Sequence, residues 1–123
     1  MIKGLVIGHR DFSGAVMHVI ESVSGDIECI DFLSNDGLST DDLTEQIQLF
    51  CEAGIQDGVV VFVDMYGGSC WRAAKKANIE NTRIVSGFNI PMLLSFIQKR
   101  QTLPFDELVR IIEYDGKRAI RKD

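Results

Sequence analysis

The sequence predicts an α/β protein of three layers, in which helices cover both faces of a mostly parallel four-stranded sheet. Short apolar runs alternate with segments of helical periodicity, and strands that alternate with helices pair in parallel through right-handed crossovers. One run, GVVVFVD at residues 58–64, is apolar up to its last residue, which is typical of a strand covered on both faces. With 123 residues, the chain has the length of one domain with one core, so we expect a single domain over residues 1–123.

The first half of the chain begins with a strand, a helix and a second strand. IKGLVIG at 2–8 is a short apolar run bounded by glycine, and IECIDFL at 27–33 has the same character. Between them we expect a helix at 13–25, with Ser13 as a candidate N-cap and Gly25 at its end. Its apolar residues recur at helical spacing: Val16, Val19, Ile20 and Val23.

A capping pattern marks the start of the second helix, expected at 39–54. Ser39 stands three residues before Asp42, and Gly54 follows the last periodic residue. One apolar stripe runs along this segment: Leu43, Ile47, Phe50 and Cys51.

The second half predicts four more elements after the strand at 58–64. A helix is expected from about 68 to 77 and a strand at 82–87, and two helices are expected at 91–100 and 104–116. The last two begin with Pro91 and Pro104, and proline is favoured in the first turn of a helix. The tail GKRAIRKD at 116–123 is short, basic and weakly strand-like.

The composition is that of a globular protein. A chain with 46% hydrophobic and 25% charged residues is not expected to be disordered, and no apolar run approaches the roughly 20 residues of a membrane span. The N-terminus lacks the long apolar region of a signal peptide, and the three cysteines are odd in number and far apart. We therefore expect a cytoplasmic protein without disulfides, metal ion or cofactor.

The net charge of -5 is unevenly distributed. Residues 1–71 hold two basic and twelve acidic residues, whereas residues 72–123 hold eleven basic and six acidic ones. The acidic half would repel nucleic acid, and the basic residues form no dense stripe, so a nucleic-acid partner is not expected. The charge fits a surface for a protein partner, or simply scattered solvated charge.

Polar residues follow two of the predicted strands, where sites of open parallel sheets form. His9 follows the first strand, and Asp64 ends the third. If these strands are neighbours, the two side chains project into one crevice. A carboxylate would fix one ring nitrogen as a donor and leave the other as a nucleophile toward phosphorus or a carbonyl, or as a metal ligand.

The segment after Asp64 suggests which group would react. Gly67, Gly68 and Ser69 lead into a helix, glycines let the backbone come close, and a helix N-terminus offers unpaired N–H groups and a positive dipole. A phosphoryl group on His9 would find its counter-charge there. Each feature also has a simpler interpretation, since Asp64 could cap the next helix, and the glycines could form only a turn.

Three segments together resemble the enzyme IIA domain of the mannose-family sugar phosphotransferase system. They are GLVIGH before a helix, VVVFVDMYGGSCWRAA, and SGFNIPMLL, and the match runs in order along essentially the whole chain. The resemblance implies a phosphocarrier, in which His9 accepts a phosphoryl group from phosphorylated HPr and passes it to a IIB domain. A permease then phosphorylates the imported sugar, so membrane contact would be indirect. Asp64 matches the aspartate that orients the histidine.

The resemblance also implies a homodimer, in which subunits exchange an antiparallel edge strand; residues 116–123 lie where that strand would be.

Three positions depart from the family pattern. Arg10 replaces a glycine that often follows the histidine, and Cys70 and Arg72 replace a proline and an asparagine that often follow the serine. Arg10 beside a phosphohistidine could bind the phosphoryl group, or it could obstruct a partner.

Other classes fit the sequence less well. A receiver domain would need an acidic pair after the first strand and a late lysine, and the chain offers neither. A nucleotide-binding enzyme is weaker still, because no Gly-x-Gly-x-x-Gly or Walker sequence occurs. A regulatory protein that is phosphorylated on His9 but signals to a partner, without feeding sugar transport, is the alternative that the sequence leaves open.

Overall fold

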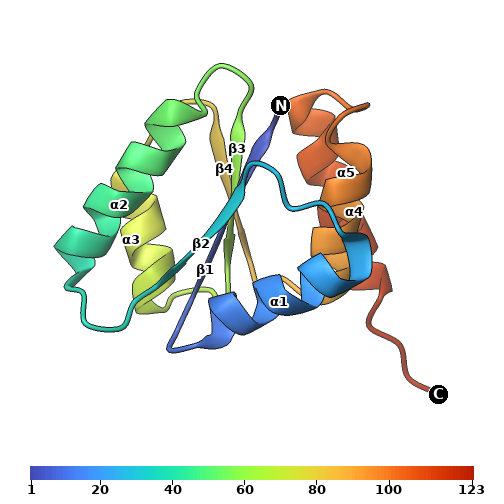
Figure 1. The fold of residues 1–123 in the computed structure, drawn as a ribbon, viewed down its shortest axis with the longest axis horizontal. Coiled ribbons are helices and arrows are strands. Elements are labelled where there is room, and N and C mark those ends of the chain that lie inside the picture. Colours follow the sequence, from blue (N-terminus) through green and yellow to red (C-terminus); the bar gives the residue numbers. More distant parts are fainter.

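The structure is a computed structural model that describes residues 1–123, and its centre is a sheet of four parallel strands in the order β2-β1-β3-β4 (Figure 1). The strands are β1 (Lys3–Gly8), β2 (Ile30–Ser34), β3 (Val59–Val63) and β4 (Thr82–Ser86). The helices are α1 (Phe12–Ser24), α2 (Thr40–Ala53), α3 (Ser69–Ala77), α4 (Ile90–Lys99) and α5 (Phe105–Arg118). The predicted three-layer class is confirmed.

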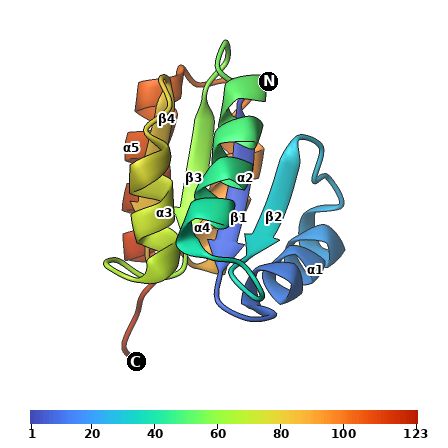
Figure 2. The ribbon, with the colours of Figure 1, turned by 90° about the vertical axis from the view of Figure 1, so that its left-hand side faces the viewer.

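Helices cover both faces of the sheet. In Figure 2, α2 and α3 lie in front of the strands, and the other three helices lie behind or beside them. Alternate residues of each strand belong to two separate hydrophobic cores, because successive side chains of a strand point to opposite faces of the sheet. Leu5 and Ile7 pack under α2 and α3, while Val6 and Phe62 join the core beneath α1, α4 and α5.

Several helix ends lie where the sequence predicts them. The Ser39 side chain accepts a hydrogen bond from the Asp42 backbone N–H at 3.1 Å, so the predicted N-cap of α2 is confirmed. Gly25 follows α1 in the left-handed conformation, with φ at 75°, and Gly54 follows α2. Asn89 caps α4 by accepting from the Met92 backbone N–H at 3.0 Å.

The prediction for Ser13 is wrong. Helix α1 begins one residue earlier, with Asp11 at the N-cap position. Ser13 is buried within the helix, and its hydroxyl donates to the Leu33 carbonyl at 2.8 Å. Strand β2 therefore supplies the hydrogen-bond acceptor that this buried hydroxyl needs. The buried stripe is therefore turned relative to the predicted one: Val19 and Val23 are exposed, and Met17 is buried.

The predicted edge strand at 116–123 is not confirmed, and its first three residues belong to a helix instead. Helix α5 continues to Arg118, and residues 119–123 form neither helix nor strand and extend away from the body (Figure 1). Gly116 does not end the helix but lets α5 approach α4, because a Cβ there would stand 2.6 Å from Cε of Met92. Exchange of the tail between two chains stays a prediction.

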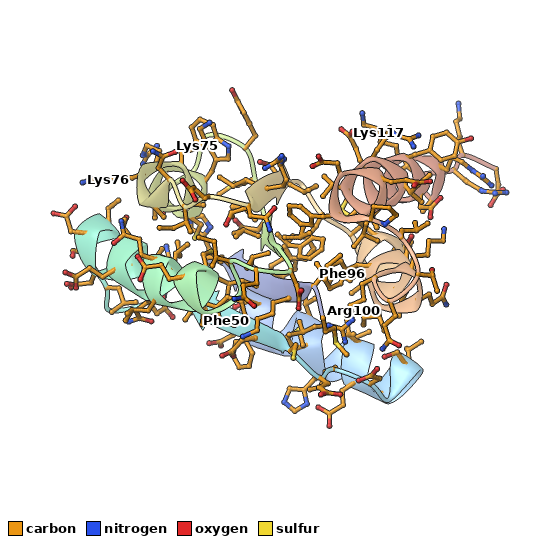
Figure 3. All side chains as sticks on the ribbon, turned by 90° about the horizontal axis from the view of Figure 1, so that it is seen from above. Phe50, Lys75, Lys76, Phe96, Arg100 and Lys117 are labelled. Atoms are coloured by element: carbon orange, nitrogen blue, oxygen red, sulfur yellow. The ribbon has the colours of Figure 1, made fainter.

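The charged residues of the second half are dispersed over the surface. Figure 3 shows Lys75 and Lys76 extending from α3 and Lys117 from a different helix, α5. One cation is buried instead: the Arg100 guanidinium lies 5.5 Å from the Phe96 ring centroid, and burial lowers its pKa. None of the helices combines the length and the apolar character that crossing a bilayer requires.

Candidate functional site

The two residues predicted to meet at the carboxyl ends of the strands are in direct contact. Strands β1 and β3 are neighbours, with Ile7 opposite Val63, so the residues that follow them emerge side by side. Nδ1 of His9 lies 2.6 Å from Oδ2 of Asp64. The same oxygen accepts the His9 backbone N–H at 3.0 Å. The carboxylate therefore holds both the ring and the backbone of His9.

This contact determines which ring nitrogen can react. A carboxylate only accepts hydrogen bonds, so Nδ1 carries a proton and Nε2 presents its lone pair in the neutral ring. The Asp64 side chain is 12% exposed, whereas the His9 side chain is 31% exposed. A buried orienting group and a more accessible nucleophile make the arrangement competent for group transfer.

Asp64 does not cap the following helix, which was its simpler interpretation. Helix α3 has Gly68 at its N-cap position and no side-chain cap. The second carboxylate oxygen, Oδ1, accepts the Met65 backbone N–H at 2.9 Å. The contacts of Asp64 are thus local to the turn and to His9.

The glycine segment brings the start of α3 to the ring. Gly67 has φ at 82°, a conformation that favours glycine, and its carbonyl accepts from the Arg72 guanidinium at 2.7 Å. A Cβ on Gly68 would lie 3.4 Å from Cε1 of His9. The Ser69 hydroxyl lies 3.3 Å from Nε2, so the reactive nitrogen faces the N-terminus of α3.

The first turn of α3 supplies free donors. Its first backbone hydrogen bond runs from the Arg72 N–H to the Gly68 carbonyl, so the N–H groups of Ser69, Cys70 and Trp71 have no partner within the helix. Such a helix start binds anions through these groups and its positive dipole. An anion attached to Nε2 would lie next to them.

Arg10 and His18 take different positions. Arg10 follows His9 directly with φ at 57°, although it is not glycine, and its side chain is exposed. His18 is exposed on α1 and makes no hydrogen bond with the pair. At the end of the fourth strand, Asn89 also lies outside the site, because its amide donates to the Gly116 carbonyl at 2.9 Å and ties α4 to α5.

Cys70 lies beneath the ring, with Sγ 3.9 Å from Nδ1 of His9. Burial, and then the charge of Asp64, raises the pKa of its thiol to about 11. His9, Asp64 and Cys70 present three donor atoms within 4.8 Å of one another. A metal ion there would have to displace the protons of both Nδ1 and the thiol, so the arrangement fits a hydrogen-bonded pair better.

Sequence reasoning missed one polar residue of the site, Asn35. It follows the end of β2, and its Oδ1 accepts the Arg10 backbone N–H at 3.2 Å. Its Nδ2 lies 3.5 Å from the Ser69 hydroxyl. The rule that sites form at strand ends would have found Asn35 had it been applied to the second strand.

Comparisons with known proteins agree on one family. The family model described as "PTS system fructose IIA component" matches residues 4–113. The sorbose-specific EIIA component of Klebsiella pneumoniae is 23% identical over 115 residues, covering 92% of this chain and 85% of that protein. The mannose-specific EIIAB component of Escherichia coli K12 is 36% identical over 67 residues, which are 52% of this chain but only 21% of that longer protein.

A comparison with solved structures supports the fold. The phosphotransferase system component EIIA from Streptococcus agalactiae superposes with a TM-score of 0.89 at 20% identity, and the match covers 99% of this chain and 97% of that one.

Proposed function

The chain belongs to the mannose-type IIA family of the phosphotransferase system, and we propose that it is a phosphocarrier that takes a phosphoryl group onto Nε2 of His9. The observation that carries the proposal is the 2.6 Å contact between Nδ1 of His9 and Oδ2 of Asp64. The donor would be phosphorylated HPr, and the acceptor a IIB domain.

The transfer step would need no groups beyond the two histidine rings, the phosphoryl group and the Asp64 carboxylate. The Nε2 lone pair attacks phosphorus, the N–P bond of the donor histidine breaks, and its electron pair returns to the donor ring. The His9 ring, protonated on Nδ1, becomes cationic as the new N–P bond forms. The Asp64 carboxylate stabilises that charge without taking the proton, in the manner of a carboxylate behind a reacting histidine.

The start of α3 would receive the phosphoryl oxygens. The Ser69 hydroxyl, already 3.3 Å from Nε2, and the free N–H groups of the first turn are donors for developing negative charge. Gly67 and Gly68 would permit the close approach of that group, and Arg10, directly after His9, would be a further candidate to bind it.

The relay would run in the cytoplasm and end at a sugar permease. Three free cysteines suit a reducing compartment. The similar proteins named above are specific for sorbose and for mannose, so a sugar is the expected final acceptor. No feature of the site favours the regulatory alternative.

A homodimer would cover one open edge of the sheet. Strand β4 forms one of the two edges, where unpaired backbone groups invite another strand. Hollows of about 540 and 330 Å³ flank it, and Ile84 and Ser86 line both. We propose that residues 119–123 of a second copy add to this edge; Ile120 is 79% exposed.

Reconstitution of the relay tests the phosphocarrier function. The protein is incubated with phosphoenolpyruvate, enzyme I and HPr, and its intact mass is measured. We expect a gain of one phosphoryl group that is labile in acid and stable in base, as for phosphohistidine. No gain in mass, or an adduct labile in base as an acyl phosphate is, would contradict the proposal.

A further inference from the structure

A chain of polar contacts leads from Asn35, directly after β2, through the Ser69 hydroxyl to the reactive nitrogen of His9. The Asn35 backbone N–H donates to the Gly8 carbonyl at 3.3 Å, which ties the residue to β1. Its Oδ1 accepts the Arg10 backbone N–H at 3.2 Å, and its Nδ2 lies 3.5 Å from the Ser69 hydroxyl oxygen. That oxygen lies 3.3 Å from Nε2 of His9.

Hydrogen-bonding capacity determines the direction of every bond in this chain. The Arg10 backbone N–H can only donate, so the carbonyl oxygen of the Asn35 amide must face it, and the NH₂ group must face Ser69. The Ser69 oxygen then accepts from Asn35. Its own proton is free to point at Nε2, which accepts because Asp64 holds the proton on Nδ1.

We propose that Asn35 is a positioning residue, which orients the Ser69 hydroxyl as a donor toward Nε2 of His9 and then toward the phosphoryl group bound there. Its effect on transfer rests on the proposed phosphocarrier function, but the orientation of the hydroxyl in the unphosphorylated protein does not. Hydrogen bonds of resting sites are commonly long and shorten when the reacting group is in place.

A second contact of the same loop provides a matched control. The Ser34 hydroxyl donates to the Arg10 carbonyl at 2.6 Å, so Ser34 and Asn35 both hold the backbone of Arg10, which has φ at 57°. Only Asn35 also reaches Ser69. Ser34→Ala therefore loosens Arg10 without touching the hydroxyl that faces the ring.

The first experiment reads the hydrogen bond directly by ¹⁵N NMR of the His9 ring in the unphosphorylated protein. In wild type we expect Nε2 to resonate as a hydrogen-bonded acceptor. Asn35→Ala should shift this resonance toward that of Ser69→Ala, whereas Ser34→Ala should leave it in place. Asn35→Asp, which keeps the acceptor for Arg10 but draws the Ser69 proton toward its carboxylate, should shift it too. An unchanged Nε2 resonance in both Asn35 variants would overturn the proposal.

The second experiment is a double-mutant cycle on the rate of phosphorylation by phospho-HPr. Asn35→Ala should slow transfer at saturating donor by about 3- to 10-fold, the worth of one hydrogen bond, with little change in KM. In a Ser69→Ala background it should slow transfer no further, because Asn35 acts through Ser69. Additive effects, or equal slowing by Ser34→Ala, would overturn the proposal. Failure of the wild type to accept a phosphoryl group would overturn the proposed function, and the NMR result would still decide the role of Asn35.

Discussion

Asp64 binds His9 twice through one oxygen: Oδ2 accepts the backbone N–H at 3.0 Å and lies 2.6 Å from Nδ1 of the ring. Strands β1 and β3 run in parallel as neighbours, so a residue just past each strand end meets the other without an intervening loop. The position and the tautomer of the ring are consequently determined by the same carboxylate.

Replacing Asp64 with asparagine should impair chemistry more than folding. The amide keeps the size of the side chain but loses the charge that stabilises the cationic ring. We expect phosphoryl transfer from phospho-HPr to slow by about 10- to 100-fold, as for loss of a partner that orients a reacting histidine. The melting temperature should change little, and stopped-flow rates and thermal unfolding measure the two effects. A normal transfer rate would mean that Asp64 only stabilises the turn that follows β3 and has no part in the chemistry.

Ser69→Ala should be milder than Asp64→Asn. It removes one hydroxyl donor 3.3 Å from Nε2, but the backbone N–H groups at the start of α3 persist. We expect transfer to slow by about 3- to 10-fold, the value of a single hydrogen bond. The two variants should be measured under the same conditions, and the reverse order of effects would contradict the assigned roles.

The features that could be read from the sequence depend on local chemistry. Ser39, three residues before Asp42, predicts an N-cap that does not depend on what the helix packs against. A fully apolar run such as residues 59–63 predicts a strand that is buried on both faces. His9 and Asp64 could be paired because sites in parallel sheets gather at the strand ends.

The missed features depend on contacts between distant segments. Gly116 looks like a helix end, but it is the point where Met92 of another helix packs. Ser13 looks like a cap, but β2 supplies its acceptor. Asn35 follows a strand end, as His9 does, but its contact with Ser69 joins positions 34 apart in the chain, which no local pattern predicts.

Cys70 should make the protein less stable in alkali. The thiol pKa rises from 9.0 to about 11 because the group is buried beside Asp64. A group whose pKa is higher in the folded state contributes stability below pH 9, and this contribution is lost as the pH rises toward 11. The free energy of unfolding of Cys70→Ala should therefore approach that of wild type between these pH values. Denaturant unfolding in the presence of reductant tests this, and parallel curves would contradict it.

Removing residues 119–123 should weaken the dimer. These residues lie beyond α5, so their loss spares the core, and the edge of β4 would lose its proposed partner. We expect a wild-type dimer at micromolar concentration in sedimentation velocity and a largely monomeric truncated form with the same melting behaviour at low concentration. Ile120→Asp is the corresponding point variant. A monomeric wild type would refute the tail exchange.

In the proposed relay His9 carries the phosphoryl group, and the chain supplies its own control in the second histidine, His18, which is exposed on α1. The decisive measurement is the intact mass of His9→Ala and His18→Ala after incubation with phosphoenolpyruvate, enzyme I and HPr. His18→Ala should gain one phosphoryl group, as wild type does, and His9→Ala should gain none. A phosphoryl group on His9→Ala would contradict the account.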